Sequence, residues 1–236
     1  MRHFKLCAAA IAGAALFATA ASADVVVLDF EGINSVYPST NYAQVLEFYN
    51  GGTSNQATSG TDYGISFTSN ALAICLNTPG NTSNCSNTSR GGEGDPNSQL
   101  GALFFLTGSQ TFMNVDAGFD TGFSFFYVGI NSGGSVSVYD DLNGGGALLA
   151  TIDLPVTPSA CDPIYSAQFC PFVPVGVAFA GTAKSVSFAG VANQVVFDDV
   201  TFGSATPGTT VPEPLSAALL GTGLLGMAAL RRRRGA

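Results

Sequence analysis

Between residues 24 and 210, short segments of alternating apolar and polar residues are separated by loops rich in Gly, Asn, Ser and Thr. Alternation with a period of two places successive side chains on opposite faces of a β-strand. The same region is rich in Val, Phe and Thr and poor in Lys and Glu, which favours strands over helices. The predicted strands cover residues 25–30, 64–68, 72–76, 102–106, 111–115, 119–129, 135–139, 147–154, 173–180, 185–189 and 194–202.

About ten strands without a helix between them predict an all-β fold, specifically a β-sandwich of the jelly-roll-like kind. Two hairpins are predicted within it. The first joins residues 102–106 to 111–115, and the second joins 135–139 to 147–154. The second turn contains Asn143 followed by glycine, a pair that suits a tight hairpin turn.

The first 23 residues have the pattern of a cleavable N-terminal signal peptide. Arg2 and Lys5 supply positive charge, residues 6–20 are apolar, and a small-residue A-x-A site ends at Ala23. We predict cleavage between Ala23 and Asp24. The alternative is an uncleaved membrane anchor, which an apolar run of this length disfavours because a spanning helix needs roughly 20 residues.

The C-terminal segment has three parts in a fixed order. Residues 215–230 form an uncharged apolar run that, as a helix, spans roughly 24 Å of a hydrocarbon core of about 30 Å. Charge at one end only predicts a single membrane helix with its positive end in the cytoplasm, rather than a buried terminal helix. The run is preceded by Pro212, Glu213 and Pro214, and is followed by Arg231, Arg232, Arg233 and Arg234.

This order of elements resembles the PEP-CTERM sorting signal of exported Gram-negative bacterial proteins. The resemblance implies that an exosortase-type membrane protease recognises Pro212, Glu213 and Pro214 and removes the hydrophobic tail. It implies transit through the inner membrane and then residence in the cell envelope, at the surface or in an extracellular polysaccharide matrix associated with biofilms. The predicted organisation is a signal peptide (1–23), a sandwich domain (24–203), a linker (204–211) and a sorting segment (212–234).

The charge and histidine content exclude several function classes. Residues 24–210 contain 15 acidic and two basic residues, a net charge of −13, which repels nucleic acid and predicts no nucleic-acid partner. The single histidine, His3, lies in the predicted signal peptide. The mature chain therefore cannot form a Ser-His-Asp, a Cys-His or a histidine-ligated zinc site.

Four cysteines remain after removal of the signal peptide, namely Cys75, Cys85, Cys161 and Cys170. An even number of cysteines in an exported chain favours disulfides. We predict the pairs Cys75–Cys85 and Cys161–Cys170, because each pair closes a short loop. Free thiols are the alternative, while a zinc site lacks both CxxC spacing and histidine.

Residues 28–32 and 197–202 look like the first and last strands of exported carbohydrate-binding sandwich domains, in which these strands commonly lie together. In a regular strand, Asp198 would share a face with Val196, Val200 and Phe202. A charge on an apolar face needs a partner, and Ca²⁺ binds carboxylate oxygens. The one cofactor predicted is thus a structural Ca²⁺ ion held by Glu31 and Asp198, which resembles the calcium of jelly-roll carbohydrate-binding modules. A β-bulge that turns Asp198 to solvent, or a backbone hydrogen bond, is the alternative.

These features together predict an exported, non-enzymatic surface or extracellular-matrix protein. One alternative is a carbohydrate-binding module, with extracellular polysaccharide as its partner and the loop tyrosines Tyr37, Tyr42, Tyr49 and Tyr63 as stacking residues. A second alternative is a glycoside hydrolase that uses a pair of carboxylates. The sequence does not place two carboxylates at catalytic distance.

Overall fold

The computed structural model describes residues 25–34, 42–76, 100–157 and 171–208. Within these ranges the chain forms β-strands and one 3-10 turn, and no α-helix. Most strands carry apolar residues at alternate positions, as expected for sheets with one face in a core. The elements are β1 (Val26–Leu28), β2 (Tyr42–Gln44), β3 (Ile65–Phe67), β4 (Leu72–Cys75), β5 (Gly101–Phe104), β6 (Gln110–Phe119), β7 (Gly122–Gly129), β8 (Gly134–Tyr139), η1 (Leu142–Gly144), β9 (Leu148–Leu154), β10 (Val173–Ala178), β11 (Ala183–Gly190) and β12 (Val195–Phe202).

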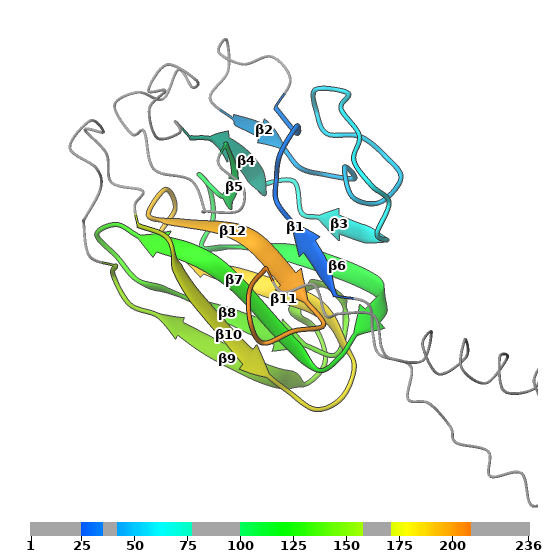
Figure 1. Ribbon diagram of the computed structural model, residues 1–236, viewed down its shortest axis with the longest axis vertical. Helices are drawn as coiled ribbons and strands as arrows, with labels where there is room; N and C mark the ends of the chain where they lie inside the picture. The colour runs from blue at the N-terminus through cyan, green and yellow to red at the C-terminus, as the bar shows by residue number, and fades with distance from the viewer. Residues whose placement is uncertain (1–24, 35–41, 77–99, 158–170, 209–236) are drawn as a thin grey trace, which may run out of the picture.

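The described strands form two antiparallel sheets (Figure 1). A seven-stranded sheet has the order β10-β7-β12-β5-β4-β2, with β1 also paired to β12. A five-stranded sheet has the order β3-β6-β11-β8-β9. The all-β class predicted from the alternation is therefore confirmed for the described part of the chain.

Aromatic side chains from both sheets meet in one core. The ring of Phe188 on β11 lies 4.8 Å from that of Phe197 on β12 and 6.2 Å from that of Phe125 on β7, in edge-on arrangements. All three side chains are fully buried. Because Phe188 belongs to the five-stranded sheet and the other two to the seven-stranded sheet, this aromatic cluster holds the two sheets together.

The second predicted hairpin is confirmed and the first is wrong. β8 pairs with β9, and Asn143 (φ 54°) and Gly144 (φ 74°) in the turn both have the left-handed backbone expected there. In contrast, β5 pairs with β4 and β12, whereas β6 pairs with β3 and β11 in the other sheet. The short connection between β5 and β6 thus crosses between the sheets instead of turning within one.

Two other strand predictions differ from the structure. The predicted long strand over 119–129 is interrupted at Asp120 and Thr121, so Phe119 ends β6 and Gly122 begins β7. β2 was not predicted, because three residues with one buried side chain give no detectable alternation. It pairs with β4 at the edge of the seven-stranded sheet.

The first and last described strands lie side by side. Val26 pairs with Phe202 and Leu28 with Val200, which agrees with the expected proximity of the terminal strands. The start of the predicted linker also contacts the sheet, since the Ser124 hydroxyl donates to the Ser204 carbonyl at 2.9 Å. The first and last described strands are therefore neighbours in the seven-stranded sheet.

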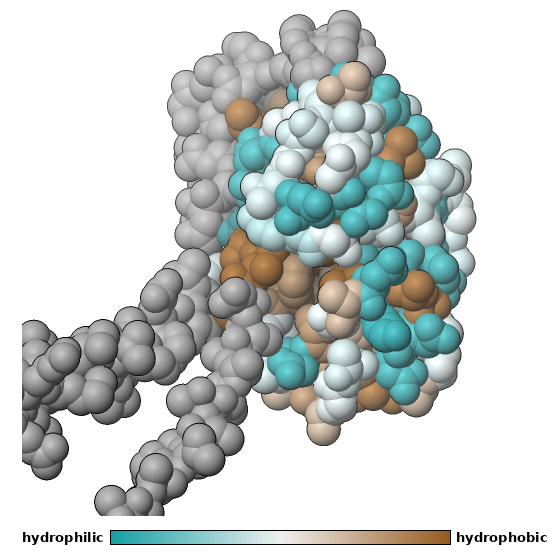
Figure 2. Space-filling model, turned by 90° about the vertical axis from the view of Figure 1, so that its right-hand side faces the viewer, coloured by the Kyte–Doolittle hydropathy of each residue, from teal (hydrophilic) through white to brown (hydrophobic). Residues whose placement is uncertain are grey.

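The face shown in Figure 2 mixes hydrophilic and hydrophobic residues, with a hydrophobic area near its centre. Over the described residues, the large apolar side chains that are most exposed come from separate segments: Leu148, Val156 and Val191. Scattered apolar residues of this kind are normal on a protein surface.

Candidate functional site

Most of the sorting and disulfide residues predicted from the sequence lie outside the described residues. The residues concerned are Ala23, Asp24, Cys85, Cys161, Cys170, Pro212, Glu213, Pro214, Arg231, Arg232, Arg233 and Arg234. The described ranges contain no helix with the length and apolar character needed to cross a membrane. The predicted signal peptide, membrane helix and sorting motif remain predictions.

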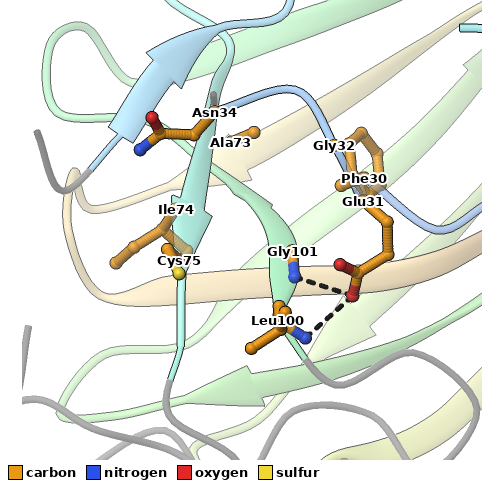
Figure 3. A pocket seen from close by; sticks show the side chains of 9 residues that line it. All are labelled: Phe30, Glu31, Gly32, Asn34, Ala73, Ile74, Cys75, Leu100 and Gly101. Atoms are coloured by element: carbon orange, nitrogen blue, oxygen red, sulfur yellow. Dashed lines mark hydrogen bonds between the residues drawn. The ribbon is translucent and has the colours of Figure 1, made fainter. Parts of the chain in front are cut away.

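A pocket of about 340 Å³ opens where the chain leaves β1 and passes the ends of β4 and β5 (Figure 3). Its walls are largely apolar, and one ionisable side chain, Glu31, lies among the lining residues that the structure describes. Apolar walls with few polar groups are typical of ligand sites. The lining residues are Phe30, Glu31, Gly32, Asn34, Ala73, Ile74, Cys75, Leu100 and Gly101.

Glu31 joins the segment after β1 to the start of β5. One oxygen of its carboxylate, Oε1, accepts hydrogen bonds from the backbone amides of Leu100 at 2.8 Å and Gly101 at 3.0 Å (Figure 3). Within the described ranges, no hydrogen-bond donor lies on its other oxygen. The pocket therefore contains a carboxylate that backbone amides of β5 and the residue before it fix at one oxygen.

The close approach of two backbones shapes this pocket. A Cβ atom at Gly101 would clash with the carbonyl oxygen of Phe30, so no larger residue fits there without a shift. Phe30 itself has φ 55°, an uncommon conformation for a bulky residue. Its amide donates to the hydroxyl of Tyr49 at 2.9 Å, which helps to hold this conformation.

Tyr49 lies beneath the segment after β1, and its hydroxyl is set among carboxylates. The hydroxyl donates to Asp29 Oδ1 at 3.4 Å. Burial raises the pKa of Tyr49 well above its usual value, and the nearby carboxylates of Asp29 and Asp198 raise it further. Tyr49 was predicted as a loop residue that stacks on sugars; with 4% of its surface exposed, it is instead a core residue.

The predicted position of Asp198 is partly wrong because β12 contains a β-bulge. The register of β12 against β7 shifts between Asp198 and Thr201, and Asp199 has φ 44°. The extra residue returns Val200 and Phe202 to the core between the sheets, so Asp198 does not share their face. The bulge and a backbone hydrogen bond were the predicted alternatives, but Asp198 is fully buried and is not turned to solvent.

The two carboxylates of the bulge have different surroundings. Asp198 Oδ1 accepts a hydrogen bond from the amide of Asp199 at 2.8 Å. Asp199 is 2% exposed, and its Oδ2 is buried without a hydrogen-bond partner. Nothing in the sequence singled out Asp199 over its neighbour, because the bulge decides which carboxylate is left without a donor.

The predicted calcium ligands do not form a complete site by themselves. The described residues contain no group of three or more His, Cys, Asp or Glu side chains able to hold a metal ion. Glu31 is bound to the start of β5, and Asp198 to the amide that follows it. An ion shared by Glu31 and Asp198 stays a prediction.

Cys75 forms a disulfide at the end of β4, beside the pocket. Its partner lies outside the described residues, because Cys75 is the one cysteine that they contain. The pairings Cys75–Cys85 and Cys161–Cys170 stay predictions.

Two of the predicted loop tyrosines are accessible. Tyr42 is 43% exposed and Tyr63 is 40% exposed, while Tyr37 lies outside the described residues. Tyr42 pairs with Ile74 across β2 and β4, so its side chain lies on the same face as that pocket residue. An exposed aromatic ring therefore lies on the face of β4 that carries Ile74, 5.9 Å from the ring of Phe104 on β5.

No family model and no curated protein matches this chain. Among solved structures, the chain is similar to the K3 cleaved adhesin domain of Lys-gingipain from Porphyromonas gingivalis W83, with 14% sequence identity and a TM-score of 0.33. The match covers 77% of this chain and 100% of that chain.

Proposed function

We propose that this chain is an exported, non-enzymatic protein of the bacterial cell surface or extracellular matrix, built on a jelly-roll-like β-sandwich and sorted through its C-terminal tail. The observation that carries the proposal is the order of Pro212-Glu213-Pro214, an uncharged apolar run and four arginines. An exosortase-type protease is the proposed partner at the inner membrane, and extracellular polysaccharide is the proposed partner after release.

The charge of the described residues supports this proposal. Eleven acidic residues and one basic residue give them a large excess of negative charge, which favours a soluble domain that does not associate with its own copies.

Intact mass of the protein recovered from cells and medium tests the sorting. We expect loss of residues 1–23 and of the segment beyond Pro214. As a matched control, Glu213→Gln should keep the signal-peptide cleavage but retain the C-terminal tail. A wild-type mass that includes residues 215–236 would contradict release, and turnover of a polysaccharide panel would contradict the non-enzymatic assignment.

A second function, carbohydrate binding, is favoured by Tyr42. Its ring is exposed, and its side chain lies on the face of β4 that carries the pocket residue Ile74. Sugar rings stack on such side chains through their apolar faces. Glu31, which also lines the pocket, adds a carboxylate, the kind of group that accepts hydrogen bonds from sugar hydroxyls.

A glycan array tests this second function. Saturable binding that Tyr42→Ala weakens at least tenfold would support it. Tyr139→Ala, a tyrosine on β8 in the other sheet, is the control and should leave binding unchanged. Absence of binding across neutral and acidic glycans would leave the surface or matrix role as the better proposal.

A further inference from the structure

The dipeptide Asn-Gly occurs at two places in the chain, Asn50–Gly51 and Asn143–Gly144. A second glycine follows each of them, so that residues 49–52 read YNGG and residues 142–145 read LNGG. Asparagine before glycine is chemically labile, because glycine has no side chain to keep its backbone nitrogen away from the asparagine amide. The sequence alone therefore predicts similar reactivity at both sites, and a difference between them has to come from the structure.

The reaction is an attack within the chain, which needs only that the two groups meet. The backbone nitrogen of the glycine gives up its proton and bonds to Cγ of the asparagine. The bond from Cγ to Nδ2 breaks, and ammonia leaves with that proton. Water then opens the resulting succinimide ring at one of its carbonyl carbons, which leaves aspartate or isoaspartate. The net change replaces ammonia by water, with no oxidant, reductant or cofactor.

The Asn143 site is held at both reacting groups. The attacking amide, that of Gly144, donates to the hydroxyl of the fully buried Ser185 at 2.9 Å. Ser185 in turn donates to the Asp141 carbonyl, which fixes the hydroxyl as an acceptor. Asn143 Oδ1 accepts from Asn114 Nδ2 at 2.9 Å, and the Asn143 amide donates to Asn114 Oδ1 at 2.8 Å. The Gly144 nitrogen therefore cannot turn toward Cγ without breaking a hydrogen bond.

The Asn50 site lacks these restraints. In the part of the chain that the structure describes, the Gly51 amide donates no hydrogen bond. The Asn50 side chain makes one bond, in which Nδ2 donates to Glu47 Oε2 at 2.7 Å, and water readily replaces such a bond at the surface. Asn50 and Asn143 are both exposed, so exposure does not separate the two sites. The hydrogen bond on the attacking amide does.

We propose that Asn50 deamidates spontaneously in the folded protein, through a succinimide formed with Gly51. In the same protein Ser185 protects the equivalent Asn143, and Asn114 holds its side chain. The modification depends on neither export nor sorting through the C-terminal tail, so it and the proposed function can fail independently.

Deamidation of Asn50 adds negative charge where carboxylates already lie. The new carboxylate replaces the amide that donates to Glu47 Oε2, so a hydrogen bond becomes a repulsion between like charges. Asp62 also lies against this turn, since its Oδ2 would be 2.9 Å from a Cβ atom at Gly51. The modified turn is therefore expected to be less stable than the original one.

Incubation of the purified protein at mildly alkaline pH, in water labelled with heavy oxygen, tests the proposal. Deamidated residues take up the label, and peptide mapping by mass spectrometry assigns it to Asn50 or Asn143. In the folded protein Asn50 should react roughly tenfold faster or more, the factor that one hydrogen bond supplies. In urea the two sites should react at similar rates. Asn50→Gln, whose longer side chain does not close a succinimide, should remove the fast signal.

Ser185→Ala tests the protection directly. It removes the acceptor of the Gly144 amide and should accelerate deamidation of Asn143 roughly tenfold. Ser187→Ala is the matched control, because Ser187 is a buried serine on the same strand whose hydroxyl donates to Gln110 instead. This control should leave the rate at Asn143 unchanged.

Three results would overturn the proposal. Equal rates at Asn50 and Asn143 in the folded protein would mean that the hydrogen bonds around Asn143 give no protection. Reaction of both sites in urea but of neither in the folded protein would mean that the turn at Asn50 is itself protected. Equal acceleration of Asn143 by Ser185→Ala and Ser187→Ala would assign the effect to a less stable β11 rather than to the contact with Gly144.

Discussion

β11 and β12 are both eight-residue strands that lie inside their sheets, yet they accommodate polar residues differently. The buried polar residues of β11 are serines, and each finds a neutral partner. Ser185 donates to the Asp141 carbonyl, and Ser187 donates to Gln110 Oε1 at 3.1 Å. β12 is buried at every position and carries two adjacent carboxylates, a bulge and an oxygen without a donor.

This difference shows that a buried carboxylate disturbs the pairing of a strand more than a buried serine hydroxyl does. A hydroxyl both donates and accepts, so it fits a regular ladder by turning toward the nearest partner. An ionised carboxylate only accepts, and it needs donors or a cation in a fixed position. β11 keeps its register along Ser185–Ala189 and shifts it against β6 only between Ala183 and Ser185, while β12 breaks its register at the two aspartates.

The largest expected effect comes from the aromatic core that β11 and β12 share. Phe188→Ala on β11 and Phe197→Ala on β12 should each lower the free energy of unfolding by about 3–5 kcal/mol, because their rings contact each other in the shared core. Urea unfolding of both variants measures this. Substantially less than additive loss in the double variant is expected for residues in contact, and full additivity would argue against one core.

A smaller effect is expected where the segment after β1 meets β5, the strand that pairs with β12. Gly101→Ala places a Cβ atom against the Phe30 carbonyl and should cost about 1–3 kcal/mol of stability. Urea unfolding measures the loss. Ala102→Gly next to it leaves that contact intact and serves as the control for changes in backbone freedom. A Gly101→Ala variant as stable as the wild type would show that this approach is not tight.

Removing a buried serine hydroxyl from β11 should lower the stability less than the core substitutions do. Ser185→Ala leaves the Gly144 amide and the Asp141 carbonyl of the β8–β9 turn without their side-chain partner and should cost about 1–2 kcal/mol. Hydrogen exchange at the Gly144 amide should accelerate, while that at the centre of β11 should stay slow. Ser137→Ala, on an exposed hydroxyl pair with Thr151, should have little effect.

The smallest effect is a loss of stability at high pH. Burial and the nearby carboxylates raise the pKa of Tyr49, so the folded state holds this proton more tightly than the unfolded state. The resulting stability is present below the unfolded pKa of about 10 and is lost as pH rises through the folded value. Urea unfolding between about pH 8 and pH 11 should show this decline.

Tyr49→Phe is the matched variant for that experiment. It removes the titrating hydroxyl, together with the acceptor for the Phe30 amide, so it should be less stable at neutral pH but less sensitive to alkali. Burial also raises the pKa of Tyr127, and Tyr127→Phe should remove a smaller part of the decline. An identical alkaline slope in the wild type and Tyr49→Phe would contradict the assigned role.

The sequence predicted most strands because alternation is a local property. Val173–Ala178 and Val195–Phe202, for example, fall inside the predicted ranges 173–180 and 194–202. The partner of each strand was harder to predict. Whether the chain after β5 turns back or crosses to the other sheet depends on packing between segments that are distant in sequence, which is why the first hairpin was wrong.

The candidate site likewise depends on features that the local sequence does not indicate. Glu31 and Asp198 were predicted as partners, but left-handed backbone at Phe30 and Asp199 redirects the chain around them. Neither residue is a glycine, so the local sequence does not predict a positive φ at either position. The pocket likewise depends on the contact between Gly101 and Phe30, two residues from segments far apart in the chain.

The pairing of β1 with β12 has a mechanical consequence. Val26 and Phe202 are neighbours, so a load applied between the two ends of the domain would peel this pair apart from its end, one contact at a time. Such geometry resists force weakly. The aromatic core joining the sheets would bear none of that load until β1 had detached, and the next segment lost would be the one that carries Asp29, Phe30 and Glu31.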